Sequence, residues 1–279
     1  MLSYQHEYHA GNHADVLKHA VLALVLRALL RKEKPLRVLD AHAGSGLYDL
    51  GSREARRNAE FEGGIGRVLA AGDAPAEIAP CLEAVRGCNG GSALRRYPGS
   101  PWLARSLLRP ADHLVLMELH PQALAALHRL FGHDPQVHLH ARDCFEGLPA
   151  LLPPPERRGL VLIDPAYEDK DDYRRVVELL AACHRRWATG VYLLWYPLLR
   201  HRPGARLPAR IAALGLRRVY QVAVEVEGEG HDGLRGSGVV AVNLPWGVDA
   251  EIAALAPWLW RTLSIQGRGR WSAGWLVPE

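Results

Sequence analysis

The chain of 279 residues has 48% apolar residues, 23% charged residues and a formal net charge of +4, which excludes a disordered chain and suits one α/β domain, or one domain with an insertion. No apolar run approaches the ~20 residues that span a bilayer, and the first residues lack the pattern of a secretory signal, so we expect a cytoplasmic protein without a membrane partner. The four cysteines form no Cys-x-x-Cys pair, which argues against a disulfide framework or a zinc site.

The first predicted element is a helix that begins after Gly11. Asn12 can cap its first turn, Asp15 suits the positive end of the helix dipole, and apolar residues then recur at helical spacing until Pro35. The opening turns of this helix therefore carry Lys18, with histidines on either side of it.

Short apolar runs that end in a polar residue follow this helix and alternate with helical stretches. The runs cover residues 36–40, 114–118, 137–143 and 160–164, with further strand candidates at 191–196, 218–226 and 238–244. Such alternation is typical of a parallel, doubly wound sheet, and the last two candidates are close enough to form an antiparallel pair at one edge. The sequence therefore predicts an α/β, Rossmann-like fold with a mostly parallel, seven-stranded sheet.

The stretch between the glycine loop and Glu118 is longer than a dinucleotide-type fold requires. In such folds the acidic residue that holds the ribose lies ~20 residues beyond the glycine loop, whereas Glu118 follows Gly44 by about seventy residues. Helical patterns fill the excess. We therefore expect a small helical insertion at residues 49–96, between a first segment of the core at 1–48 and the remainder of the core at 97–279.

Four of the predicted strands end in an acidic residue. These residues are Asp40, Glu118, Asp143 and Asp164. Ligands of open α/β sheets bind beyond the carboxyl ends of the strands, and a glycine loop that includes Gly44 would let the backbone approach a cofactor there. Glu118 could accept both ribose hydroxyls and Asp143 the adenine amine, although a lone aspartate at such a turn can equally be a helix N-cap. Their convergence predicts a nucleotide-like cofactor.

The strand at residues 160–164 leads into Asp164-Pro165-Ala166-Tyr167, which is similar to the Asp-Pro-Pro-Tyr signature of amino-methyltransferases that act on adenine. The adenine amine is a poor nucleophile because its lone pair is delocalised into the ring. If Asp164 and the Pro165 carbonyl each accept one of its protons, the lone pair is directed at the methyl group of S-adenosylmethionine. Tyr167 would stack on the base, which must leave its helix. The alternative is a proline-terminated strand with a packed tyrosine.

Motifs along the whole chain resemble the bacterial RlmJ family. They lie at residues 1–6, 9–19, 40–44, 97–101, 118–121, 194–197 and 275–279. The resemblance implies a Rossmann-like core with a helical insertion. It also implies transfer of a methyl group from S-adenosylmethionine to N6 of a specific adenine in 23S ribosomal RNA, the expected partner, by a protein that we expect to act as a monomer.

The resemblance also assigns roles to residues of this chain by matching position. Contacts with S-adenosylmethionine fall on His19, His42, Ser100, Glu118, Asp143, Cys144 and Asp164, and catalysis falls on Asp164. We add Lys18, a cation beside His19, and Gly44 of the glycine loop as cofactor neighbours. Tyr4 would touch the RNA, and we expect His6 to lie on the substrate side with it.

Two residues depart from the family pattern. Cys144 stands where a glycine is expected, which is tolerable if only its backbone N–H faces the cofactor. Ala166 stands where a second proline is expected, and alanine removes the bias that would hold Pro165 in an extended conformation. We therefore expect an active site that is less preorganised at Pro165.

The same residues are compatible with two other functions. The same tetrapeptide serves DNA adenine-N6 methyltransferases, although no large target-recognition domain for duplex DNA is evident. A non-catalytic nucleic-acid-binding protein, linked to the use of external DNA, is the alternative from a different class. The positive net charge suits any of these partners but equally suits a solvated surface. The amino-terminal histidines lack acidic or cysteine companions at a recognised metal spacing, so we expect no metal.

Overall fold

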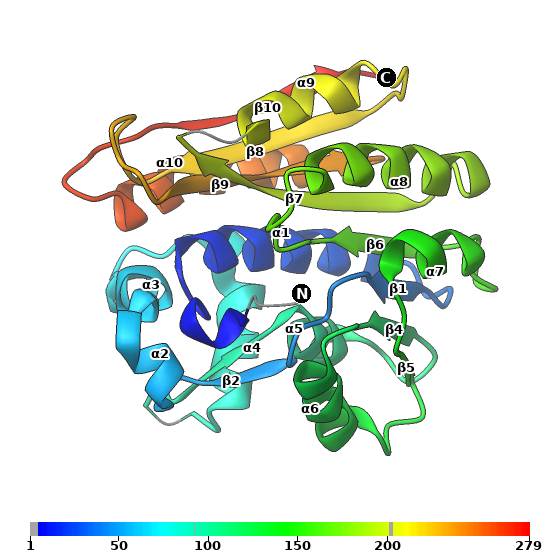
Figure 1. Ribbon diagram of the computed structural model, residues 1–279, viewed down its shortest axis with the longest axis horizontal. Coiled ribbons are helices and arrows are strands. Elements are labelled where there is room, and N and C mark those ends of the chain that lie inside the picture. Colours follow the sequence, from blue (N-terminus) through cyan, green and yellow to red (C-terminus); the bar gives the residue numbers. More distant parts are fainter. Residues whose placement is uncertain (1–4, 92, 201–202) are drawn as a thin grey trace.

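The computed structural model describes residues 5–91, 93–200 and 203–279 and is organised around one sheet of eight strands in the order β10-β8-β9-β7-β6-β1-β4-β5 (Figure 1). The parallel strands are β1 (Arg37–Asp40), β4 (His113–Met117), β5 (Val137–His140), β6 (Gly159–Ile163) and β7 (Val191–Leu199). The antiparallel strands that extend the sheet beyond β7 are β9 (Leu234–Val242), β8 (Val219–Glu225) and β10 (Trp271–Val277).

The sheet has eight strands rather than the predicted seven. All seven predicted runs form strands, and the antiparallel pairing of β8 with β9 is confirmed, but β10 lies outside β8 and forms the edge. The sequence analysis missed β10 because an edge strand does not need a buried apolar face. Trp271 and Trp275 are each 40% exposed, so β10 shows no clear period-two burial.

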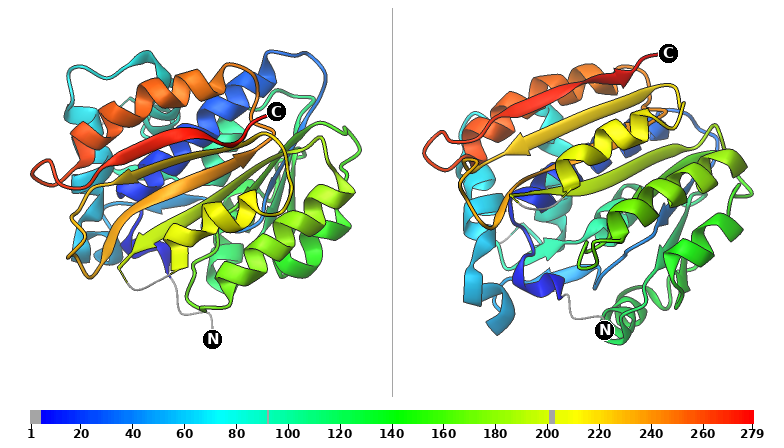
Figure 2. Two further views of the ribbon diagram at one scale, coloured as in Figure 1. Left: turned by 90° about the horizontal axis from the view of Figure 1, so that it is seen from above. Right: turned by 45° about the horizontal axis from the view of Figure 1, so that its top comes forward.

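Helices cover both faces of the sheet, as the two oblique views in Figure 2 show. One face carries α1 (His13–Leu30), α5 (Ser100–Leu107), α6 (Pro121–Phe131) and α10 (Val248–Leu263). The other face carries α7 (Cys144–Ala150), α8 (Asp172–Arg186) and α9 (Leu207–Ala212), which follows the short helix η4 (Pro203–Arg206). Successive residues of β6 alternate between the two cores, so this strand is buried on both sides up to the residue before Asp164.

Helix α1 begins where the sequence predicts. The Asn12 side chain accepts hydrogen bonds from the backbone N–H groups of Ala14 and Asp15, at 3.0 Å each, and so caps the helix. The helix packs between α5, α10 and β9 and is buried along most of its length. Its first turns therefore carry two charged residues, Asp15 and Lys18, into the interior.

A helical segment lies between β1 and α5. It comprises α2 (Arg53–Asn58), η2 (Glu62–Gly66), α3 (Arg67–Ala70), η3 (Ala76–Ile78) and α4 (Ala79–Cys88). The short strands β2 (Leu47–Asp49) and β3 (Arg96–Pro98) pair antiparallel where the chain leaves and rejoins the core, a feature that the sequence analysis did not predict. The domain boundaries at 49 and 96 stay a prediction.

Close backbone packing joins this segment to the turn before α1. The Ile65 N–H donates to the Gly11 carbonyl at 2.9 Å, and a Cβ at Gly64 would collide with the same carbonyl oxygen. The segment therefore rests directly on the chain that precedes α1. In the described part of the chain, no helix combines the length and apolar character needed to cross a membrane.

Candidate active site

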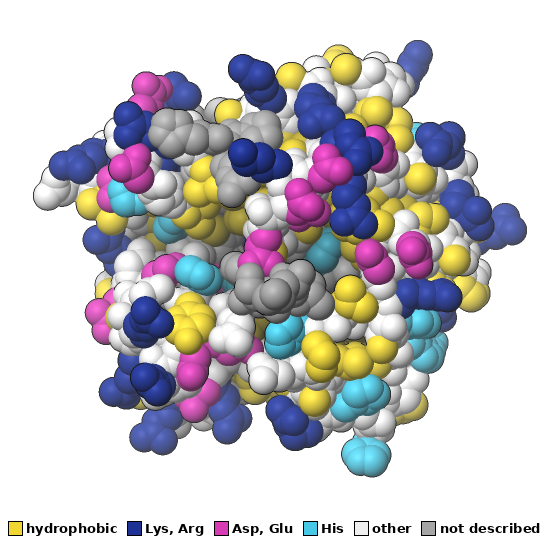
Figure 3. Space-filling view, in the orientation of Figure 1, with side chains coloured by type: hydrophobic (Ala, Val, Ile, Leu, Met, Phe, Trp, Pro, Cys, Tyr) yellow, Lys and Arg dark blue, Asp and Glu magenta, His cyan; other side chains and the backbone are white. Residues whose placement is uncertain are grey.

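A cavity of about 660 Å³ opens at the carboxyl ends of the parallel strands, where the sequence analysis placed a ligand. Figure 3 shows this face of the molecule hollowed near its centre, with carboxylate and histidine side chains around the hollow. The predicted site residues that line it are His6, Lys18, His19, His42, Gly44, Ser100, Glu118, Asp143, Cys144, Asp164 and Pro165. Tyr4 lies outside the described residues.

Glu118 and the glycine loop hold each other through backbone hydrogen bonds. The Gly44 N–H donates to Oε2 of Glu118 at 2.8 Å, and the N–H groups of Leu119 and His120 donate to Oε1 at 2.8 and 2.7 Å. Gly44 has φ +59°, and a Cβ there would collide with the Tyr48 hydroxyl. A carboxylate offers about four acceptor sites, so one remains for a ribose hydroxyl. For Glu118 to accept hydrogen bonds from both ribose hydroxyls, as predicted, one of its three hydrogen bonds from backbone N–H groups would have to break.

Two buried polar atoms near the glycine loop lack a hydrogen-bond partner among the described residues. They are Nε2 of His19, which lines the cavity, and Oδ2 of Asp40 at the end of β1. The other ring nitrogen of His19 lies 2.9 Å from the Tyr97 hydroxyl, and burial lowers the pKa of His19 to about 3. Burial raises the pKa of Asp40 to about 6. Because His19 lines the cavity, its unsatisfied nitrogen indicates that a polar ligand completes this part of the site.

A buried ion cluster occupies the opposite side of the cavity. The Lys18 ammonium lies 2.6 Å from Oδ2 of Asp164 and 2.9 Å from Oδ1 of Asp15, and Asp15 also accepts from the Gly11 N–H and lies 2.8 Å from Nε2 of His6. Burial opposes the charge on Lys18, but the two carboxylates outweigh it and hold its pKa well above the usual value. Burial raises the pKa of Asp164 despite the nearby ammonium.

Asp143 is the N-cap of α7, the alternative that the sequence analysis left open. Its Oδ1 accepts the Phe145 N–H at 2.8 Å, while Oδ2 lies 3.5 Å from the Arg175 guanidinium. That guanidinium also lies over the Phe145 ring, 3.6 Å from its centroid. The buried Cys144 follows as the first residue of the helix. Asp143 therefore caps a helix and lines the cavity at once.

The structure does not place Tyr167 for the predicted stacking role. Tyr167 is 3% exposed and is not among the residues that line the cavity. Its backbone has φ +53°, which turns the side chain into the core beneath α8, where the ring centroid lies 4.5 Å from that of Tyr173. The hydroxyl donates to the Trp195 carbonyl at 2.7 Å. Tyr167 therefore supports the middle of β7, at Trp195, and presents no face to the cavity.

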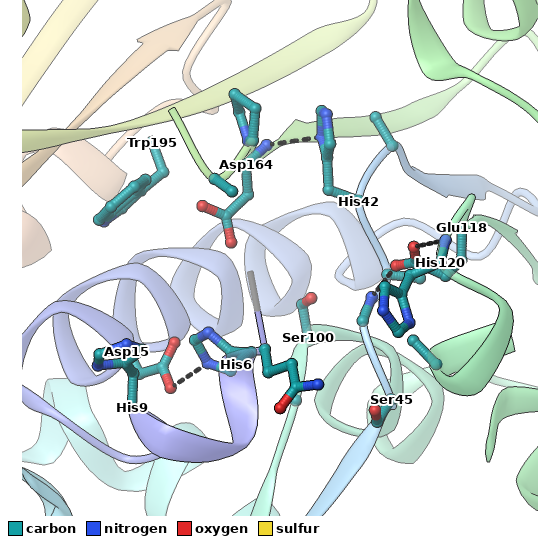
Figure 4. A pocket seen from close by; sticks show the side chains of 18 of the residues that line it. His6, His9, Asp15, His42, Ser45, Ser100, Glu118, His120, Asp164 and Trp195 are labelled. Carbon is teal, nitrogen blue, oxygen red and sulfur yellow. Dashed lines mark hydrogen bonds and ion pairs between the residues drawn. The ribbon is translucent and has the colours of Figure 1, made fainter. Parts of the chain in front are cut away.

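Trp195 supplies an aromatic face that the sequence analysis did not assign. It lines the cavity from β7, and its ring centroid lies 5.9 Å from the Lys18 ammonium. Figure 4 shows Asp164 between Trp195 and His42. The sequence does show two adjacent aromatic residues at 195–196, but the alternation of side chains along a strand does not tell which of the two rings faces the cavity.

Glu60 is the second missed residue, and it comes from the helical segment. Its carboxylate lies 2.9 Å from Nδ1 of His9 and accepts from the Asn12 side chain at 3.0 Å, and all three residues line the cavity. The helical segment therefore forms part of the cavity wall. No sequence motif marks Glu60, because its partners lie about fifty residues away in the chain.

The fold and the site together define a class, an α/β methyltransferase with a cofactor cleft at the strand ends beside an adenine-type acceptor motif. A family model described as "Ribosomal RNA large subunit methyltransferase D, RlmJ" matches residues 33–277, and the chain belongs to this family. The predicted resemblance is thereby confirmed.

Two curated relatives and one crystal structure cover nearly the whole chain. The chain is 43% identical to "Ribosomal RNA large subunit methyltransferase J" of Escherichia coli (strain K12) over 280 residues, with 100% of both chains covered. It is 42% identical to the protein of the same name from Haemophilus influenzae, with the same coverage. The crystal structure of protein LPL1258 from Legionella pneumophila matches with a TM-score of 0.86 and 32% identity, covering 95% of this chain and 97% of that one.

S-adenosylmethionine is the methyl donor of this class, and the residues present fit it. The orphaned Nε2 of His19 can meet a polar group of its amino-acid end, Glu118 has an acceptor site for the ribose, and the acidic residues around the cavity suit a cationic sulfonium. The glycine loop leaves the backbone free of a Cβ at Gly44. These residues would hold the cofactor on the side of the cavity formed by β1 and β4.

Proposed function

We propose that the protein transfers a methyl group from S-adenosylmethionine to N6 of a specific adenine in 23S ribosomal RNA. The observation that carries the proposal is the position of Asp164, at the carboxyl end of β6 and on the wall of the same cavity as Glu118 and His19. A carboxylate so placed can accept a proton from an exocyclic amine. The names of the full-length relatives support ribosomal RNA of the large subunit as the substrate.

The chain's own residues prepare the amine. Asp164 and the Pro165 carbonyl would each accept one of its hydrogen bonds, which localises the nitrogen lone pair on the face that attacks. The Lys18 ammonium, 2.6 Å from the carboxylate, favours the ionised form of Asp164 and so opposes the effect of burial on its pKa. When bound, S-adenosylmethionine supplies the methyl group as an electrophilic sulfonium. As the new N–C bond forms, the bond between the methyl carbon and the sulfur would break, and the sulfur would leave as a neutral thioether. The amine would then carry a positive charge, which the Asp164 carboxylate stabilises until it accepts the proton and passes it to solvent.

The substrate base would enter on the side of Trp195. With Tyr167 buried, the Trp195 ring is the aromatic surface beside Asp164, and Pro197 and Leu234 extend an apolar wall from it. A flipped base gains stacking energy on such a surface, which offsets the cost of leaving its helix. His6 lies across the cavity, and we keep it and Tyr4 as proposed RNA contacts.

Ala166 lines the cavity next to Pro165 and is exposed. We keep the proposal that alanine leaves the Pro165 carbonyl less restrained than a second proline would. Monomeric action, a cytoplasmic location and the core-and-insertion boundaries at residues 48, 49, 96 and 97 are parts of the same proposal.

Substrate competition tests this function. Purified protein is incubated with methyl-labelled S-adenosylmethionine and an equimolar mixture of transcribed 23S ribosomal RNA and adenine-containing duplex DNA, and labelled nucleosides are separated from each. We expect N6-methyladenosine in the RNA alone. Label in the DNA would support the adenine-DNA alternative, and label in neither, with intact cofactor binding, would overturn the proposal.

A further inference from the structure

The loop after β1 is anchored to both neighbouring strands on either side of His42. The Ala41 N–H donates to the Leu162 carbonyl of β6 at 2.9 Å, and the Ala43 N–H donates to the Met117 carbonyl of β4 at 3.0 Å. Because β1 lies between β6 and β4 in the sheet, the loop spans the two strand ends. His42 is therefore held at a fixed place between the Asp164 side and the cofactor side of the cavity.

Both ring nitrogens of His42 have a partner. The backbone N–H of Asp164 donates to Nδ1 at 3.2 Å, the contact drawn in Figure 4, and Nε2 lies 3.2 Å from the Cys144 sulfur. A backbone N–H can only donate, so Nδ1 must be unprotonated. The hydrogen of the neutral ring is then on Nε2, directed at the sulfur. This geometry fixes one tautomer.

The surroundings of His42 keep the ring neutral. Burial lowers the pKa of His42 to about 4; the nearby Asp143 carboxylate opposes this shift, whereas the charges of Arg175 and Lys18 add to it. These groups come from α7, α8 and α1, the elements around the ring. A protonated ring would set an N–H against the Asp164 N–H and lose the contact.

We infer that His42 is a positioning residue for methyl transfer, which fixes the peptide that precedes Asp164 and ties it to Cys144 at the start of α7. The inference rests on the proposed function and goes beyond a cofactor contact. Asp164 and Pro165 follow that peptide directly, so its orientation influences the direction of the Asp164 carboxylate and, because proline has a fixed φ, that of the Pro165 carbonyl. A loosened peptide would therefore misplace both acceptors of the amine while leaving Glu118 and His19 in place.

Paired substitutions separate positioning from cofactor binding. In His42→Leu both ring contacts are lost, whereas in His42→Asn an acceptor remains near the place of Nδ1. We expect His42→Leu to lower kcat at saturating cofactor on the order of 100-fold, in addition to any rise in the cofactor Kd from the loss of its predicted cofactor contact. His42→Asn should recover about tenfold of that loss by restoring one hydrogen bond to the backbone. The matched controls are His138→Leu and His138→Asn, on the exposed part of β5 outside the cavity.

A raised cofactor Kd with unchanged kcat in His42→Leu would overturn the inference, as would an asparagine variant no better than leucine. If the wild-type protein methylates no RNA, the proposed function itself is contradicted, whatever the His42 variants do. Should the leucine variant fail to fold, nitrogen NMR of the wild-type imidazoles gives an independent answer. With a pKa of about 4, His42 should stay neutral and Nε2-protonated between about pH 5.5 and 8. A proton on Nδ1 would contradict the assignment.

Discussion

The two sides of the cavity are built in different ways. On the cofactor side, Glu118 is held by three backbone N–H groups, so its position follows from the strand ends and the glycine loop. On the substrate side, Asp164 faces Lys18 and Trp195, which come from α1 and β7. The first arrangement depends on the backbone, and the second depends on side chains from distant parts of the chain. Substitutions on the two sides should therefore fail in different ways.

The largest expected effect comes from Lys18. Lys18→Met leaves the buried Asp15 and the half-buried Asp164 without their shared cation, so we expect the free energy of unfolding to fall by about 3–5 kcal/mol. Methyl transfer should fall as well, because Asp164 would then take up a proton. Chemical denaturation and turnover measure the two effects. Arg174→Met, in an exposed ion pair, is the control and should change the free energy of unfolding little. An equal cost in both variants would remove the special role of the buried cluster.

A smaller effect, of a different kind, is expected on the cofactor side. Glu118→Gln loses charge but keeps an oxygen acceptor, and its amide cannot accept from all three backbone donors. We expect the Kd for S-adenosylmethionine to rise about 10- to 100-fold, while kcat at saturating cofactor changes little. Isothermal calorimetry and saturation kinetics test the split. A fall in kcat with unchanged Kd would show that the two sides are not separate.

A third effect, on RNA binding, is expected from Trp195 on the substrate side of the cavity. Trp195→Ala removes the aromatic surface that lines the cavity, so we expect the KM for RNA to rise by about 5- to 100-fold, in line with the stacking energy of one base. The cofactor Kd should stay the same. Tyr167→Phe is the companion variant, because it removes the hydrogen bond to the Trp195 carbonyl but no cavity surface. Because phenylalanine keeps the ring, Tyr167→Phe should leave the KM for RNA close to the wild-type value, and an unchanged KM in Trp195→Ala would contradict the stacking role of Trp195.

The smallest effect concerns the contact between the helical segment and the chain before α1. The Glu60 carboxylate raises the pKa of His9, so the pair stabilises the fold fully below the unfolded value of 6.5, and this stability is lost as the pH rises through the raised pKa. Both side chains are about a third exposed, which limits the effect to under about 1 kcal/mol. His9→Gln should lower the Tm at pH 6 and match the wild type at pH 9. A constant difference would exclude the ion pair.

The sequence predicted the cofactor side better than the substrate side, and the reason is physical. Strand ends, glycine turns and the carboxylate of Glu118 are local features, and the order of strands brings them together. Trp195 and Glu60 were missed because their place in the cavity depends on packing between distant segments. The burial of the Tyr167 ring was not foreseen because it depends on a left-handed backbone at that residue, which turns the ring into the core. Strand β10 was missed because it is an exposed edge.

The central claim is that Asp164 directs methyl transfer to adenine N6 in RNA. It is tested most directly by nucleoside mass spectrometry of 23S ribosomal RNA after incubation with S-adenosylmethionine and the wild type, Asp164→Asn or Asp171→Asn. Asp171 is the matched control, an exposed aspartate paired with Arg174. We predict N6-methyladenosine with the wild type and with Asp171→Asn, and at least about a 1000-fold slower transfer with Asp164→Asn, which still binds the cofactor. Transfer by Asp164→Asn within tenfold of the wild-type rate would contradict the account.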